Sequence, residues 1–162
     1  MTDQKHNYRL RELDEAYAMA QTLAHFFPDP DRFMIRICEL LLNAVEHGNL
    51  GIGFEMKADL VRQGKWHEEI ARRLALPENA EKHVEIELTR DYIECKLVIA
   101  DQGRGFPWQD YIGRQVNVRF LNGRGLWIAC NTPFDSVTFN PAGNVVTCVA
   151  QREHPPSAAQ SI

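Results

Sequence analysis

Glu39 and Asn43 lie four residues apart in a segment that is otherwise mostly apolar. If residues 31–47 form one helix capped by Asp31, both side chains project from the same face, because four residues make about one turn. Apolar side chains cover roughly two thirds of this helix, so it should be deeply embedded and its polar arc should face water or line a pocket. The arc is formed by Arg36, Glu39, Asn43, Glu46 and His47.

The side chains of this arc are suited to metal-assisted proton chemistry. An asparagine oxygen is a ligand type that Mg²⁺ accepts, and Mg²⁺ takes few protein ligands when phosphates supply the rest. A glutamate such as Glu39 can accept a proton from an attacking oxygen. The alternative is an ordinary solvated face, in which Glu39 forms an ion pair with Arg36. For His47 we favour a local hydrogen bond or a helix-end cap over a metal contact.

Two glycine-containing segments follow the helix in the sequence. Asp101-Gln-Gly-Arg-Gly-Phe106 comes directly after the strand-like run 92–100, and Gly123-Arg-Gly-Leu126 opens the helix-like run 126–130. Taken separately, the first is typical of a turn and the second of a linker, because glycine tolerates positive φ. Their order behind the Glu-x-x-x-Asn helix makes the combination much more specific than either segment alone.

The three segments together resemble the nucleotide-binding boxes of the GHKL superfamily, which includes gyrase, the ninety-kilodalton heat-shock chaperone, histidine kinases and MutL. Residues 39–43 match the asparagine box, residues 101–106 the first glycine box and residues 123–126 the second. The resemblance covers roughly residues 8 to 151. Within the superfamily the wording Glu-x-x-x-Asn-Ala-x-x-His-Gly, Asp-x-Gly-x-Gly-Phe and Gly-Arg-Gly-Leu is most similar to that of the anti-sigma-factor serine kinases.

This resemblance implies ATP and Mg²⁺ as cofactors, with defined residue roles. Asn43 would bridge Mg²⁺ to the triphosphate, and Glu39 would take a proton from water or from a protein hydroxyl. Asp101 would accept the exocyclic amine of adenine and so select ATP over GTP. Gly103 and Gly105 would let the backbone pass close beneath the base, where a Cβ would collide.

The nucleotide-binding set implied by the resemblance is completed by His47, Phe106, Gly123, Arg124, Gly125, Leu126 and Thr147. Gly123 and Gly125 would free backbone N–H groups at a helix N-terminus for phosphate oxygens. Arg124 would add charge to the same phosphates, although a solvated arginine fits the pattern equally well. Thr147 would reach the adenine site through a water, with packing against the helices as the alternative.

The elements that must position these residues predict an α+β fold. Helical patterns occupy the first half, and period-two alternation begins at Val84, with a last hairpin around residues 141–144. We expect a two-layer sandwich with helices on one face of a mixed, mostly antiparallel sheet, as in the Bergerat ATP-binding fold. Residues 1–152 would form one histidine-kinase-like ATPase domain, with a helical insertion at about 50–82 and a disordered tail at 153–162. The insertion would be a partner surface or an annex to the core.

Composition limits the classes of partner and the compartment. The chain has 162 residues, 44% hydrophobic and 25% charged, with a net charge of −4. An acidic balance argues against a nucleic-acid partner, and no apolar run reaches the ~20 residues needed to span a membrane. The first ten residues are polar and do not form a signal peptide. Four widely spaced cysteines predict buried reduced thiols. We therefore expect a cytoplasmic protein.

The expected activity is that of a bacterial signalling enzyme. As an anti-sigma-type serine/threonine protein kinase, it would bind ATP or ADP and transfer the γ-phosphoryl group to a small STAS-like antagonist protein. Its binding to a sigma factor or to the antagonist would depend on the nucleotide. The alternative is a nucleotide-regulated module that sequesters a partner without phosphoryl transfer. A plain ATPase of the MutL or gyrase sort is a weaker option. The pattern also allows a homodimer, and the chain as a fragment of a larger sensor or receiver protein.

Overall fold

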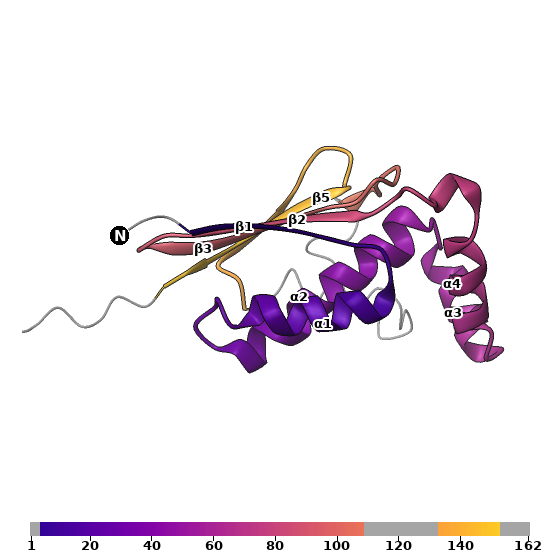
Figure 1. Ribbon diagram of the computed structural model, residues 1–162, viewed down its shortest axis with the longest axis horizontal. Helices are drawn as coiled ribbons and strands as arrows, with labels where there is room; N and C mark the ends of the chain where they lie inside the picture. Colours follow the sequence, from indigo (N-terminus) through magenta and orange to yellow (C-terminus); the bar gives the residue numbers. More distant parts are fainter. Residues whose placement is uncertain (1–3, 109–132, 153–162) are drawn as a thin grey trace, which may run out of the picture.

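The computed structural model describes residues 4–108 and 133–152. In this part of the chain, helices form one layer and a five-stranded sheet forms the other, as Figure 1 shows with the sheet nearly edge-on. This confirms the predicted α+β sandwich of two layers. The predicted tail at 153–162 and the second glycine segment at 123–126 lie outside the described residues.

The sheet has the strand order β1-β2-β3-β5-β4, and each of the four pairings between these described strands is antiparallel. Period-two alternation turns one side chain in two toward the helices, including buried Ile86, Leu97 and Cys148. The register opposes Ala100 to Val145, so the segments that follow β3 and precede β5 meet at one edge. The strands are β1 (Gln4–Leu10), β2 (Val84–Arg90), β3 (Glu94–Ala100), β4 (Ser136–Phe139) and β5 (Val145–Gln151).

Two helices, α1 (Leu13–Ala24) and α2 (Pro30–Asn43), pack against each other beneath the sheet. The sequence predicted Asp31 as the N-cap of the second helix, and this was wrong. Asp29 is the N-cap and accepts a hydrogen bond from the Arg32 N–H, while Pro30 occupies the first helical turn. Proline is favoured there because its missing N–H needs no partner in the first turn.

The single helix predicted over residues 31–47 is also corrected. Regular α-helix ends at Asn43, and residues Ala44–Asn49 form a π-helical turn, η1. Such turns are rare in proteins as a whole, and those that occur are often found at functional sites. The expected deep burial holds for Ile37 and Leu41 but not for Met34 and Ile35, the latter 52% exposed. Periodicity counted them as apolar without indicating that they lie on the exposed side of the helix.

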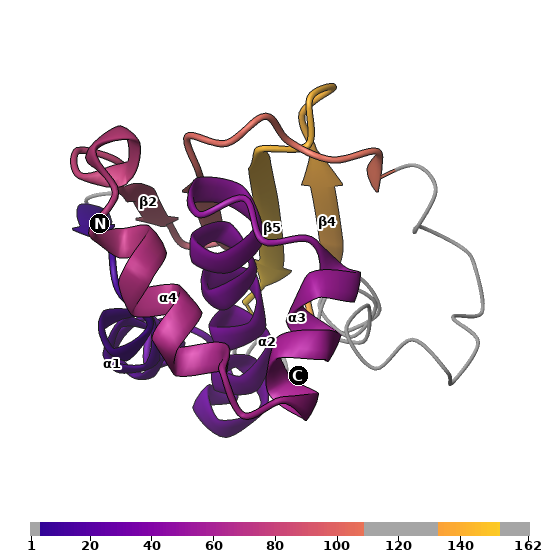
Figure 2. The same ribbon diagram turned by 90° about the vertical axis from the view of Figure 1, so that its right-hand side faces the viewer.

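The predicted insertion contains α3 (Phe54–Arg62), α4 (Trp66–Leu74) and the short 3₁₀ turn η2 (Pro77–Asn79). Both helices lie at one end of the molecule, beside the C-terminal end of α2 (Figure 2). Ile70 of α4 belongs to the core, whereas α3 has no buried residue. The Arg73 guanidinium donates to the carbonyls of Leu50 and Gly51 at 2.7 and 3.0 Å. The insertion is therefore an annex fastened to the end of the π-turn.

Three of the four cysteines lie in the described part of the chain. Cys95 is buried and free, Cys38 is free and half-buried, Cys148 is buried, and Cys130 lies outside the described residues. Within residues 4–108 and 133–152, no helix is both long and apolar enough to cross a membrane.

Candidate functional site

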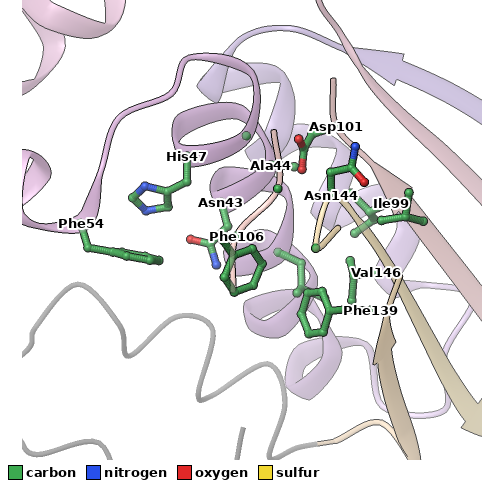
Figure 3. A pocket seen from close by; sticks show the side chains of 15 residues that line it. Asn43, Ala44, His47, Phe54, Ile99, Asp101, Phe106, Phe139, Asn144 and Val146 are labelled. Atoms are coloured by element: carbon green, nitrogen blue, oxygen red, sulfur yellow. The ribbon is translucent and has the colours of Figure 1, made fainter. Parts of the chain in front are cut away.

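A cleft opens between the C-terminal end of α2, the π-turn, and the sheet edge where β3 ends and β5 begins (Figure 3). The space inside is about 70 Å³. Its walls are mostly apolar, with a few polar groups between them, which is the usual character of a small-molecule site. The lining residues are Leu40, Asn43, Ala44, His47, Gly48, Phe54, Ile99, Asp101, Gly105, Phe106, Phe139, Gly143, Asn144, Val145 and Val146.

Asp101 marks one end of the cleft, which we call the Asp101 end (Asp101, Gly103 and Asn144). Its carboxylate accepts a hydrogen bond from the Gly103 N–H at 2.8 Å. Its own N–H donates to the Asn144 carbonyl at 2.9 Å, which extends the β3–β5 pairing by one residue. The Asn144 side chain donates to the Gly103 carbonyl at 3.4 Å. Two of these hydrogen bonds join the loop after β3 to the loop before β5, and the third, from the Gly103 N–H, holds the carboxylate at this edge of the sheet.

Glycines make the close approach at this end sterically feasible. A Cβ at Gly48 would lie 2.6 Å from the Asp101 Oδ1, and one at Gly103 would lie 2.7 Å from the carbonyl carbon of Gly48. Gly105 has φ +77°, and its Cβ would lie 2.6 Å from the Ala142 carbonyl carbon. Both the close contacts and the left-handed φ exclude larger side chains. The π-turn, the Asp101 loop and the last hairpin therefore approach one another closely at these glycines.

Burial raises the pKa of the Asp101 carboxyl to about 6, and the hydrogen bond from Gly103 only partly opposes this effect. A buried carboxylate is costly unless it meets a donor. Asp101 receives a single hydrogen bond from the described residues, so an amine or amide N–H entering the cleft would satisfy its remaining acceptor capacity.

His47 and Phe54 form the opposite end, which we call the His47 end. The His47 Nδ1 contacts the carbonyl of Ile52, and the two rings lie 4.1 Å apart between centroids. The predicted local hydrogen bond of His47 is confirmed. Burial lowers the pKa of the imidazole to about 4, so the ring is neutral and Nδ1 carries the proton that it donates to Ile52. Nε2 is buried and has no hydrogen-bond partner among the described residues.

Asn43 lies between the two ends and directs its amide into the cleft (Figure 3). One asparagine oxygen matches what Mg²⁺ needs when phosphates and water supply the other ligands. No group of three or more His, Cys, Asp or Glu side chains in the described residues could hold a metal unaided. A metal here would therefore depend on a bound anionic ligand.

Glu39 is half-buried one turn before Asn43, and it is not among the residues lining the cleft. Glu39 lies near enough to Glu46 and Cys38 for its charge to raise the pKa of both groups. It therefore belongs to the same polar stripe, beside the cleft rather than in it.

The structure brings together most of the described residues that the sequence singled out. Asn43, His47, Asp101, Gly105 and Phe106 line the cleft, and Gly103 lies directly behind Asp101. Gly123, Arg124, Gly125 and Leu126 lie outside the described residues.

Thr147 is a correction. Alternation along β5 turns Val146 and Cys148 toward the helices and Thr147 toward the opposite face of the sheet. It neither lines the cleft nor packs against the helices, so both readings of its role were wrong.

Several lining residues were missed by sequence reasoning. Phe139 packs edge-on against Phe106 at 5.5 Å, and Asn144 faces Asp101 across the sheet edge. Phe54 comes from the annex. The last hairpin was predicted, but its register against β3 was not, and only that register brings Asn144 beside Asp101. No sequence pattern indicated that Phe54 lies beside His47, because an irregular loop separates the π-turn from α3.

No family model matches the chain, and no curated protein matches it significantly. The resemblance to GHKL proteins therefore depends on the three short sequence segments.

Proposed function

We propose that this chain is a bacterial ATP-binding signalling domain of the GHKL type, acting as a serine/threonine protein kinase. Its substrate would be a small antagonist protein, its cofactor Mg·ATP, its place the cytoplasm, and its further partner a sigma factor. One observation carries the proposal: Asp101 and Asn43, far apart in sequence, line the same apolar cleft, and their chemistry suits the two ends of an adenine nucleotide.

Each residue would have a distinct task in this reaction. Asp101 would accept a hydrogen bond from the adenine amine, while Ile99, Val146 and Phe139 would provide apolar contact to the base. The Asn43 oxygen would hold Mg²⁺, which neutralises charge on the phosphates. Glu39, one turn away, would take the proton of the substrate hydroxyl as that oxygen bonds to the γ-phosphorus and the bond to ADP breaks.

A transfer assay with Glu39→Gln tests the kinase reaction. The substitution keeps the shape of the side chain but removes the proton acceptor, so transfer to an antagonist domain should fall by about 10²–10⁴-fold while ATP affinity stays within a few-fold. Glu68→Gln, at an exposed position of α4, is the matched control and should transfer normally. Normal transfer by Glu39→Gln would remove Glu39 from the role of base.

The second candidate is a nucleotide-regulated binding module without phosphoryl transfer. One observation favours it: Glu39 does not line the cleft, so the assigned base has no direct access to it in this arrangement. The same assay separates the two candidates. A wild-type protein that binds ATP and changes its affinity for a partner, yet phosphorylates none of the antagonist domains, would support the module.

A further inference from the structure

Asn49, the last residue of the π-turn η1, joins the helix layer to the loop that follows β3. Its side chain is buried, with the residue 3% exposed, and its Oδ1 accepts a hydrogen bond from the Gln102 N–H at 2.7 Å. The Asn49 Nδ2 is also buried and has no hydrogen-bond partner among the described residues. A buried N–H group without a partner costs free energy, so packing alone does not explain an amide here. What the amide provides is the hydrogen bond to Gln102.

The hydrogen-bonded peptide is the one between Asp101 and Gln102. The N–H before it, that of Asp101, donates to the Asn144 carbonyl, and the N–H after it, that of Gly103, donates to the Asp101 carboxylate. The peptides on both sides of the Asp101 Cα are therefore held, one by the sheet and one by Asn49. Because each peptide is a rigid plane, the direction of the Asp101 side chain is restricted as well.

Asn49 is itself anchored on the side away from the cleft. The Lys82 ammonium donates to the Asn49 carbonyl at 3.2 Å. The Gln102 side chain is also held, because its Oε1 accepts a hydrogen bond from the His83 N–H at 2.7 Å. Both anchoring residues lie directly before β2. Asn49 is therefore a fixed point for the loop and does not simply follow its movements.

The steric contacts at this end have a different effect from the hydrogen bond. Gly48 and Gly103 leave no room for a Cβ, so the π-turn and the loop cannot approach more closely. Steric contact sets a lower limit on their separation but does not keep them together. The hydrogen bond from Gln102 to Asn49 sets the upper limit.

We propose that Asn49 is a positioning residue for adenine recognition, which holds the Asp101 carboxylate toward the cleft through the Gln102 N–H. This inference rests on the proposed nucleotide site. Asn49 is not among the residues lining the cleft, so it acts through Asp101. Without this hydrogen bond the carboxylate could turn away. It would then accept the adenine amine less well and oppose the guanine carbonyl less strongly.

The ratio of ADP affinity to GDP affinity tests the inference, because the two ligands differ only in the base. Calorimetry at pH 8 keeps Asp101 ionised, since its pKa is about 6. Asn49→Ala removes the acceptor and should lower the ratio several-fold. Asn49→Asp keeps an accepting oxygen in the same place, beside the Lys82 ammonium, and should keep the wild-type ratio. A wild-type ratio in Asn49→Ala overturns the inference.

Asn79 provides the matched control, because it is a second buried asparagine, 6% exposed, in the same polar network. Its side chain accepts from Lys82 at 3.0 Å and donates to the Arg73 carbonyl at 2.9 Å. Asn79→Ala should therefore reduce stability in urea without changing the ratio. If Asn79→Ala lowers the ratio as much as Asn49→Ala, the role of Asn49 is merely structural and the inference is wrong.

A double variant tests whether Asn49 acts through Asp101. In an Asp101→Ala background, Asn49→Ala should have no further effect on the ratio, whereas additive effects would contradict the proposal. If Asn49→Ala fails to fold, amide exchange in the wild type decides. The Gln102 N–H should exchange at least about a hundredfold more slowly than in an unstructured chain, and free exchange overturns the inference. A wild type that binds ADP and GDP equally would instead overturn the adenine site itself, and this inference with it.

Discussion

The two ends of the cleft are built by different means. At the Asp101 end, three segments come into close contact, and Gly48 and Gly103 leave no room for a Cβ. At the His47 end, the contacts are made by the rings of His47 and Phe54, and α3, which supplies Phe54, has no buried residue of its own. An end packed around glycines has one shape, whereas an end made of side chains from a helix without buried residues can adapt.

The difference also appears in the protonation of the two ends. Burial raises the pKa of Asp101 to about 6, and burial lowers the pKa of His47 to about 4. Each shift favours the neutral form of its group. The fixed end therefore holds an acid that needs a donor from a ligand, and the adaptable end holds a neutral imidazole. This suits recognition of a flat base with an amine group at the Asp101 end.

The largest expected effect comes from breaking the backbone contact at the fixed end. Gly48→Ala would place a Cβ 2.6 Å from the Asp101 Oδ1. The carboxylate cannot retreat without losing its bond to Gly103, so the variant should lose about 1–3 kcal/mol of stability and most of its ATP affinity. Urea unfolding and calorimetry measure the two effects.

Gly53→Ala is the matched control for that substitution. A Cβ at Gly53 has no heavy atom within 4 Å, and the residue has φ −67° at the start of α3. We expect a change in stability below about 1 kcal/mol and unchanged ATP binding. Equal losses in both alanine variants would show that the Gly48 contact has no special role.

The fixed and adaptable ends were not equally predictable from the sequence. The chemistry at Asn43 and Asp101 could be read from residue type and spacing, and period-two alternation gave the strands. The π-turn could not be predicted from the sequence, because the same apolar pattern continues through Ala44 and Val45. Thr147 was misplaced because apolar residues alternate on both faces of β5, so the pattern does not show which face the helices cover. Contacts across irregular loops, such as Asn49 with Gln102, leave no periodic signal at all.

A smaller effect should appear in the pH dependence of adenosine binding. If only ionised Asp101 accepts the adenine amine, a pKa of about 6 predicts roughly tenfold weaker binding at pH 5 than at pH 7.5. Adenosine is the right probe because it has no phosphate that titrates in this range. Asp101→Asn removes the titrating group and should flatten the profile. A wild-type profile that is already flat would contradict the assigned role.

Folding stability should also depend on pH, and the sign of this dependence differs between the ends. The raised pKa of Asp101 means that its contribution is fully present below about pH 4 and is lost as pH rises toward 6. The lowered pKa of His47 means the reverse, with stability lost as pH falls from about 6.5 toward 4. Relative to wild type, Asp101→Asn should gain stability toward pH 7, and His47→Gln should lose less on acidification. Urea unfolding at several pH values measures both, with slopes of at most about 1.4 kcal/mol per pH unit. Parallel profiles for the wild type and both variants would contradict the opposed shifts.

Calorimetric titration of the wild-type protein with Mg·ATP and Mg·GTP tests the central claim most directly. Adenine presents an amine donor where guanine presents a carbonyl acceptor, and the Asp101 carboxylate can only accept. We expect ATP to bind and GTP to bind at least about tenfold more weakly, with Asp101→Ala losing about tenfold or more in ATP affinity. Equal affinity for ATP and GTP, or no binding of either, would contradict the account.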